Sequence, residues 1–237
     1  LASKLSRYLS PQVYQSIFSG KKNVKIEAYR KKLTVFFSDI KGFTEITDRL
    51  EPEVLSTLLN SYLNEMSKIA LKYGGTIDKF VGDAILIFFG DPETKGDKED
   101  AYSCVLMALE MQERMHHLKN LWEGQGITNP LEIRIGINTG YCNVGNFGSE
   151  NRLDYTIIGG EVNLASRLES NAMTGQILIS QETYALIKKH IVCEKKDEIK
   201  VKGIAHKIQT YQVVGSYKNI AQKRKILNEK FDGFNLK

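Results

Sequence analysis

The 237-residue sequence has few of the residues and segments that mark several protein classes. Its 3 cysteines, Cys104, Cys142 and Cys193, are far apart and odd in number, so they form neither a disulfide framework nor a metal-binding spacing. We therefore expect a reducing compartment and a cytoplasmic location. No apolar run approaches the roughly 18 residues that a membrane span requires, and no repeat of fixed period is present.

The remaining composition is that of an ordinary globular domain with appendages. Hydrophobic residues make up 42% and charged residues 26% of the chain, which fits a folded domain that buries a sizeable core. The chain begins at Leu1 rather than at Met. We therefore expect that it is part of a longer protein, with an upstream sensor or membrane domain to which the cytoplasmic part is tethered.

The net charge of +5 comes from the two ends of the sequence. Residues 1–32 contain eight Lys or Arg and one Glu, and residues 218–237 contain six basic and two acidic residues. Residues 33–217 contain 19 basic and 25 acidic residues. This distribution argues against nucleic acid as a partner of the central part. The basic ends are either solvated arms or contacts for lipid or acidic partners.

The patterning divides the chain into a helical lead-in (1–32), a central domain (33–217) and a basic tail (218–237). In the lead-in, Ser10-Pro11 resembles a helix start and Gly20 a helix end. This segment is either a packing appendage or a signalling helix joined to an upstream domain.

The central domain alternates between strand and helix patterns in the order β-α-β-β-α-β, followed by αββ additions. This order predicts an α+β, ferredoxin-like fold whose antiparallel-containing sheet is covered by helices. We expect a strand at 131–139 that turns at Gly140 into a second strand, Tyr141–Asn146. The other strands are expected at 33–38, 76–80, 84–89, 154–158, 177–180, 191–201 and 207–214, and long helices at 51–73 and 100–121.

Two aspartates follow or interrupt apolar strands. Asp39 ends the run "VFFSD", and Asp83 lies in the turn of "KFVGDAILIFF". Because these strands are neighbours in a ferredoxin-like sheet, the two carboxylates can face one point, where they repel each other unless a cation compensates. Mg²⁺ accepts one or two carboxylates together with waters and substrate phosphates. The alternative is that each aspartate is an ordinary turn residue.

Two further segments suggest phosphate binding. Gly42-Phe43-Thr44 starts a helix directly after Asp39, where free N–H groups attract anions. Asn163 and Arg167 share one face of the helix after Gly159-Gly160, and an arginine there can stabilise a transferring phosphoryl group. The alternative for Arg167 is a surface pair with Glu161 or Glu169.

Together these segments resemble class III nucleotidyl cyclases. "VFFSDIKGFT", "IDKFVGDAILIFF" and "YTIIGGEVNLASRL" look like the three characteristic segments of that family, in the right order, and "RIGINTG" and "VKG" also fit. The resemblance covers about residues 33–214, so it implies that the central domain is a cyclase catalytic domain. It also implies a homodimer whose two active sites each combine residues of both chains.

The resemblance implies a role for each matching residue. Asp39 and Asp83, with the Ile40 carbonyl, would hold two Mg²⁺ or Mn²⁺ ions per active site, and Asn163 and Arg167 would hold ATP and stabilise the transition state. Lys79 and Thr156 would contact the purine. The phosphates would be contacted by Gly42, Phe43 and Thr44, and Lys202 would reach the triphosphate.

Lys79 is expected to decide which base is bound. Its ammonium can only donate, which suits N1 of adenine and opposes the hydrogen on N1 of guanine. The hydroxyl of Thr156 can accept from an amino group or donate to a guanine oxygen, so on its own it leaves both bases open. The threonine resembles a subgroup that includes bicarbonate-responsive cyclases. Without the family, Lys79 would be interpreted as a solvated hairpin lysine.

Three rival interpretations remain beside an adenylate cyclase. A guanylate cyclase is one alternative, because the Thr156 hydroxyl can also donate to a guanine oxygen. A diguanylate cyclase would carry a Gly-Gly-Asp/Glu-Glu-Phe hairpin, whereas this chain has "KFVGDA". A non-catalytic regulatory module of the same shape would usually lose a metal aspartate, the asparagine or the arginine, and all of them are present.

Overall fold

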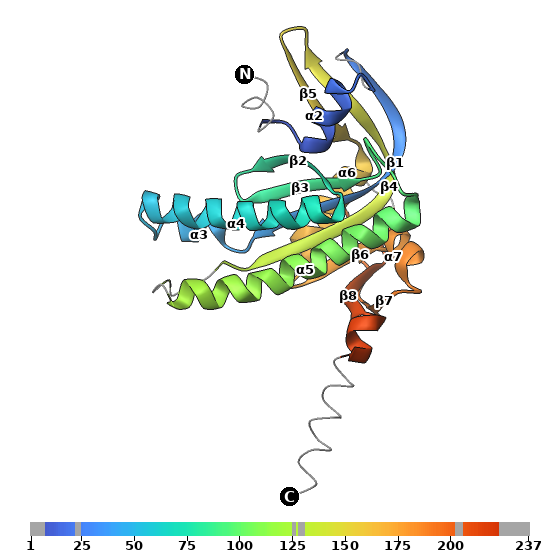
Figure 1. Cartoon of the computed structure of the whole chain (residues 1–237). Helices are drawn as coiled ribbons and strands as arrows, with labels where there is room; N and C mark the ends of the chain where they lie inside the picture. Colours follow the sequence, from blue (N-terminus) through green and yellow to red (C-terminus); the bar gives the residue numbers. More distant parts are fainter. Residues whose placement is uncertain (1–7, 22–24, 125–126, 128–130, 202–205, 223–237) are drawn as a thin grey trace, which may run out of the picture.

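A computed structural model describes residues 8–21, 25–124, 127, 131–201 and 206–222 (Figure 1). Its centre is an 8-stranded sheet in the order β2-β3-β1-β4-β6-β8-β7, with β5 paired to β4. The strands are β1 Glu27–Ile40, β2 Thr76–Val81, β3 Ala84–Phe89, β4 Ile133–Ser149, β5 Arg152–Ile158, β6 Ile177–Ser180, β7 Ile191–Lys195 and β8 Thr210–Ser216. The helices are α2 Pro11–Phe18, α3 Phe43–Thr47, α4 Pro52–Tyr73, α5 Asp97–Gly124, α6 Gly160–Asn171 and α7 Gln181–Ile187.

The first four strands confirm the ferredoxin-like core. Strand β1 lies between β3 and β4 and is antiparallel to both, and β2 pairs antiparallel with β3 at the edge. The helices α4 and α5 provide the two crossovers of the β-α-β-β-α-β order. Strand β6 extends the sheet by pairing parallel to β4, and β8 and β7 complete the predicted extension.

The two faces of the sheet pack against different helices, as alternate residues of β1 show. Phe36 and Ile40 belong to the large core cluster that includes α4 and α5. Leu33 and Val35 point the other way, into a smaller cluster with Val162 of α6. Figure 1 shows α4 and α5 side by side along one face, with α6 on the other side of the sheet. Asp39 alternates in step with Leu33 and Val35, so it lies on the α6 face.

The predicted turn at Gly140 is wrong. Strand β4 runs without interruption from Ile133 to Ser149 and pairs with β1 from Ile133 to Asn146, on both sides of Gly140. A Cβ atom at Gly140 would lie 2.6 Å from the side chain of Glu161. The glycine therefore leaves room for the Glu161 side chain of α6, and it stands in a continuous strand rather than in a turn.

The N-terminal part of the chain forms the expected helix between Ser10 and Gly20. The Ser10 side chain accepts from the Val13 amide at 3.3 Å, and Pro11 takes the first helical position of α2. Strand β1 then starts at Glu27, six residues before the expected boundary at 33. The start of the lead-in, with Leu1 and Leu5, and residues 223–237 of the basic tail lie outside the described residues. None of the helices in the described ranges combines the length and apolar composition of a membrane span.

Candidate active site

The structure brings Asp39 and Asp83 to one edge of the sheet. Asp39 is the penultimate residue of β1, and Asp83 lies in the turn between β2 and β3. Strand β3 pairs with β1 up to Ile85, opposite Ser38. The Ile40 amide donates to Asp83 Oδ2 at 2.9 Å, so the loop carboxylate is held against the end of β1.

The electrostatics of this edge favour a bound cation. Burial raises the pKa of Asp83, and the charge of Asp39 adds to the rise. The Asp39 side chain keeps 31% of its surface exposed and is open to a ligand. Among the described residues, no three His, Cys, Asp or Glu side chains form a metal cluster. The two carboxylates offer oxygen ligands of the kind that Mg²⁺ or Mn²⁺ takes together with water and phosphate oxygens.

Sequence reasoning missed the two residues that support Asp39. Arg134, opposite Asp39 on β4, places its guanidinium 3.2 Å from Asp39 Oδ1 and 3.0 Å from Glu169 Oε1. Glu169 is buried on α6, and burial, followed by the charge of Asp39, raises its pKa to about 7. The sequence did contain a signal for Glu169. Its helical spacing from Val162 and Ala165 places its carboxylate on the buried face of α6.

Lys79 and Thr156 are brought together from β2 and β5. Lys79 Nζ lies 2.8 Å from Asp154 Oδ2 and 3.4 Å from Asp78 Oδ1. Burial opposes its charge, but Asp154 and Asp78 outweigh it and raise its pKa. Thr156 Oγ1 donates to Asp78 Oδ2 at 2.6 Å, across 78 positions of sequence. Lys79 is thus part of an ion-pair network and is not a freely solvated lysine.

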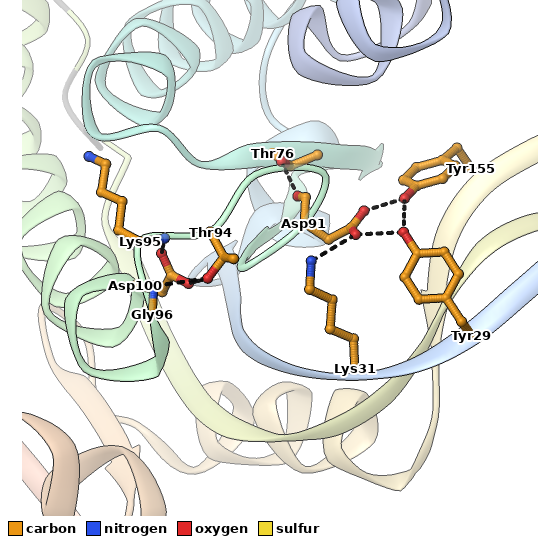
Figure 2. A network of polar contacts seen from close by, with 9 residues as sticks. All are labelled: Tyr29, Lys31, Thr76, Asp91, Thr94, Lys95, Gly96, Asp100 and Tyr155. Atoms are coloured by element: carbon orange, nitrogen blue, oxygen red, sulfur yellow. Dashed lines mark hydrogen bonds and ion pairs between the residues drawn. The ribbon is translucent and has the colours of Figure 1, made fainter. Parts of the chain in front are cut away.

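A buried polar network anchors β5, the strand that carries Thr156 (Figure 2). The hydroxyls of Tyr155 and Tyr29 both donate to the carboxylate of Asp91, which is 2% exposed. Lys31 donates to the same carboxylate at 3.1 Å, and Thr76 donates to its backbone carbonyl at 2.7 Å. Burial raises the pKa of both tyrosines, to about 12 for Tyr29. The network ties β5 to β1, β2 and the loop after β3.

Asn163 and Arg167 lie on the exposed side of α6. Together with Ser166 and Val201 they line one pocket. The two acids that the sequence offers as partners of Arg167 have other contacts, because Glu161 accepts from Asn138 at 2.7 Å and Glu169 pairs with Arg134. Lys202 lies outside the described residues, directly after Val201.

The Gly42-Phe43-Thr44 segment follows the edge that carries Asp39 and Asp83 and forms the start of α3. Gly42 has a φ of +68°, a conformation that glycine adopts at little cost, and a Cβ atom there would meet nothing within 4 Å. Gly42 and Thr44 are exposed, whereas Phe43 packs against the main core. The backbone of Gly42 is therefore open to a ligand, and the Phe43 side chain serves packing.

This combination of sheet, carboxylates and α6 polar side chains is the one that the resemblance implies. The family model for the adenylate and guanylate cyclase catalytic domain matches residues 24–215. The chain belongs to this cyclase family. The predicted family and the mixed fold with its helix-covered sheet are thereby confirmed, and catalytic domains of this family generally use divalent metal ions.

Similar cyclases of both specificities have been characterised. The crystal structure of the adenylyl cyclase CyaB from P. aeruginosa is 64% identical with a TM-score of 0.79, over 81% of this chain and 97% of that chain. That of the guanylyl cyclase Cya2 is 37% identical with a TM-score of 0.76, over 81% and 95%. An adenylate cyclase of Anabaena cylindrica is 30% identical over 222 residues, which cover 89% of this chain and 41% of that protein.

A longer relative shows how small a part of some cyclases this domain represents. The terminal-differentiation specific adenylate cyclase of Dictyostelium discoideum is 34% identical over 221 residues, or 90% of this chain and 10% of that protein. The chain thus spans less than half of the length of either this protein or the Anabaena cyclase.

Proposed function

We propose that the chain is an adenylate cyclase catalytic domain that converts ATP to 3′,5′-cyclic AMP and pyrophosphate. The observation that carries this proposal is the meeting of Lys79 and Thr156 around Asp78, which creates a donor for adenine N1 beside a hydroxyl. The 64% identity to an adenylyl cyclase supports the same base. Guanylate cyclase is the second candidate, because a guanylyl cyclase is 37% identical to this chain.

In the reaction, the ribose 3′-oxygen attacks the α-phosphorus and pyrophosphate leaves. Asp39, Asp83 and the Ile40 carbonyl would hold two Mg²⁺ or Mn²⁺ ions per site. Such ions lower the pKa of the 3′-hydroxyl and steady the polyphosphate. Asp39 or solvent takes the proton. Asn163 and Arg167 orient the nucleotide and stabilise charge in the transition state. Gly42, Phe43 and Thr44 contact the phosphates through their backbone, and Lys202 reaches the triphosphate.

We further propose that each site is shared between the two chains of a homodimer, with the metal-binding aspartates from one chain and Asn163 and Arg167 from its partner. Within one chain, Asp39 is paired with Arg134, while Arg167 lines a separate pocket with Ser166 and Val201. Large apolar side chains near the candidate site, Phe80, Val81 and Ile158, are 44%, 62% and 49% exposed. A second copy of the chain would cover them. An upstream sensor or membrane domain completes the proposed protein.

The proposal is tested by incubating the purified chain with ATP or GTP in the presence of Mn²⁺ or Mg²⁺ and identifying the product by chromatography and mass spectrometry. We expect cyclic AMP from ATP, with little cyclic GMP from GTP. Predominant cyclic GMP would establish the guanylate cyclase alternative. A folded dimer that binds nucleotide but forms neither product would establish the non-catalytic module.

A further inference from the structure

Asp78 is a buried carboxylate for which the proposed reaction has no direct use. It follows Ile77 in β2, its side chain has no exposed surface, and it faces β5. Three donors surround its two oxygens. Thr156 Oγ1 lies 2.6 Å and the Ile157 amide 3.3 Å from Oδ2, and Lys79 Nζ lies 3.4 Å from Oδ1.

This arrangement fixes the direction of one hydrogen bond. A carboxylate surrounded by an ammonium, an amide N–H and a hydroxyl can satisfy all three only as an acceptor. The backbone amide of Ile157 cannot reverse its role, and Lys79 can only donate. The single hydrogen of the Thr156 hydroxyl is therefore directed at Asp78, and only the lone pairs of Oγ1 remain for a ligand.

The consequence concerns the choice of base and rests on the proposed function. The 6-amino group of adenine donates, and the 6-oxo group of guanine accepts. A free threonine hydroxyl could serve either group by rotating. A hydroxyl whose hydrogen is already bonded to Asp78 can only accept from the base. It therefore matches the amino group of adenine, whereas its lone pair repels the 6-oxo oxygen of guanine.

We propose that Asp78 is a specificity-determining positioning residue, which commits the Thr156 hydroxyl to accept from the base and thereby selects ATP over GTP. Asp78 itself touches no substrate. It acts through Thr156, while its weaker contact with Lys79 supports the second base contact. From the sequence, the Thr156 hydroxyl could either donate to the base or accept from it. Asp78, on a different strand, leaves only the accepting role.

The test is a double-mutant cycle that measures base preference by binding. The proteins are the wild-type chain, Asp78→Leu, Thr156→Val and the double variant. The probes are 3′-deoxy-ATP and 3′-deoxy-GTP with Mn²⁺, which lack the attacking hydroxyl and cannot be cyclised. Calorimetry gives the ratio of their dissociation constants. We expect Asp78→Leu to lower the preference for adenine about tenfold, since one matched hydrogen bond is replaced by an adaptable one.

The decisive comparison is the effect of Asp78→Leu in a protein that lacks the Thr156 hydroxyl. In the Thr156→Val background, Asp78→Leu should change the ratio by less than about twofold, because no hydroxyl remains to be oriented. Asp154→Asn is the matched control, since it removes the 2.8 Å partner of Lys79 but does not contact Thr156. Its effect should be the same with Thr156 and with valine. If Asp78→Leu does not fold, Asp78→Ala replaces it, since water in the vacated space can donate or accept.

The possible outcomes separate the role of Asp78 from the proposed function. An equal effect of the Asp78 substitution with and without the Thr156 hydroxyl would overturn the proposal, because Asp78 would then act through Lys79 or through packing. Coupling between Asp78 and Thr156 in binding, together with no cyclic nucleotide from ATP, would uphold the positioning role and overturn the proposed function alone. Failure of the folded wild-type chain to bind either analogue would overturn both.

Discussion

At the metal edge, formed by Asp39, Asp83, Arg134 and Glu169, the guanidinium of Arg134 pairs with Asp39 and Glu169, and Asp83 is held by the Ile40 amide. At the base edge, formed by Asp78, Lys79, Asp154 and Thr156, Asp78 and Asp154 share the ammonium of Lys79, and Asp78 alone accepts from the Thr156 hydroxyl. In both places a buried carboxylate on a neighbouring element holds the group that would contact the ligand. Glu169 acts through Arg134 on Asp39, and Asp78 acts directly on Thr156.

The metal edge and the base edge differ in how far their own side chains balance the buried negative charge. The metal edge has three carboxylates for one guanidinium, and burial first, with the charge of Asp39 added to it, raises the pKa values of Asp83 and Glu169, so a cation would complete this edge. The base edge has two carboxylates for one ammonium; burial raises the pKa of Asp78 there too, but Asp78 accepts hydrogen bonds from Thr156 and Ile157 in fixed directions. The first edge should therefore be sensitive to the loss of charge, and the second to the loss of hydrogen-bond direction.

The largest expected effect is the loss of a metal-edge carboxylate. Asp83→Ala should lower cyclic nucleotide formation by about a thousandfold or more, because removing a metal ligand removes several kcal/mol of transition-state stabilisation. The fold should persist, since the Asp83 side chain lies in a turn. Rates and circular dichroism would be measured beside Asp48→Ala, which removes an exposed carboxylate nearby and should retain activity. Normal turnover by folded Asp83→Ala would refute the metal assignment.

Mixed dimers test whether the two sets of residues belong to different chains. Asp39→Ala and Arg167→Ala proteins should each be nearly inactive. After free exchange of equal amounts, about half of the dimers are mixed, and each mixed dimer has one intact site and one site with both defects. Activity should recover to about a quarter of the wild-type value.

The control for this experiment is chain exchange followed independently, by mass spectrometry of differently labelled chains. If exchange is complete and activity stays at the level of the separate mutants, the catalytic residues of each site all come from one chain. The shared site would then be wrong, although the metal assignment could stand.

A change of base-edge donors should give a smaller effect than the loss of a metal ligand. Lys79→Glu should reduce the preference for ATP over GTP by about ten- to a hundredfold, since a mismatched polar contact costs about 1–3 kcal/mol. Adding Thr156→Cys should shift the preference further toward GTP. The loss of ATP turnover is expected to exceed the gain with GTP. An unchanged ATP rate and selectivity in Lys79→Glu would remove Lys79 from base recognition.

The smallest expected effect is on how the free energy of unfolding of the chain depends on pH. The pKa of Glu169 is raised by burial from 4.5 to about 7, so between these pH values the folded chain keeps a proton that the unfolded chain has lost. Ionised Glu169 therefore lowers the free energy of unfolding as pH rises through this range, by about 1–3 kcal/mol. Glu169→Gln stays neutral and should flatten that part of the stability profile.

Denaturant unfolding between pH 5 and pH 8, with a chelator present, measures this difference. Glu182→Gln, which changes an exposed glutamate of α7, is the control and should follow the wild-type profile. Parallel profiles for the wild type and Glu169→Gln would contradict the raised pKa of Glu169.

The sequence by itself determined the family and the order of the core elements. It also indicated which residues matter, because Asp39 and Asp83 each lie beside an apolar strand and Asn163 and Arg167 are four residues apart on a helix. These signals are local, since side-chain periodicity of 2 or 3.6 residues places them on faces and ends of elements. The turn predicted at Gly140 failed because a glycine that makes room for a neighbouring side chain, here Glu161, looks in the sequence like a turn glycine.

Only the tertiary structure decided which groups support these residues. Arg134 reaches Asp39 across 95 positions of sequence and Glu169 across 35, and Asp78 reaches Thr156 across 78. Such contacts follow from strand register and from the packing of α6 and β5 on the sheet, which no local pattern specifies. The direction of the Thr156 hydrogen bond is of this kind, because a hydroxyl takes its role from the partner that folding places beside it.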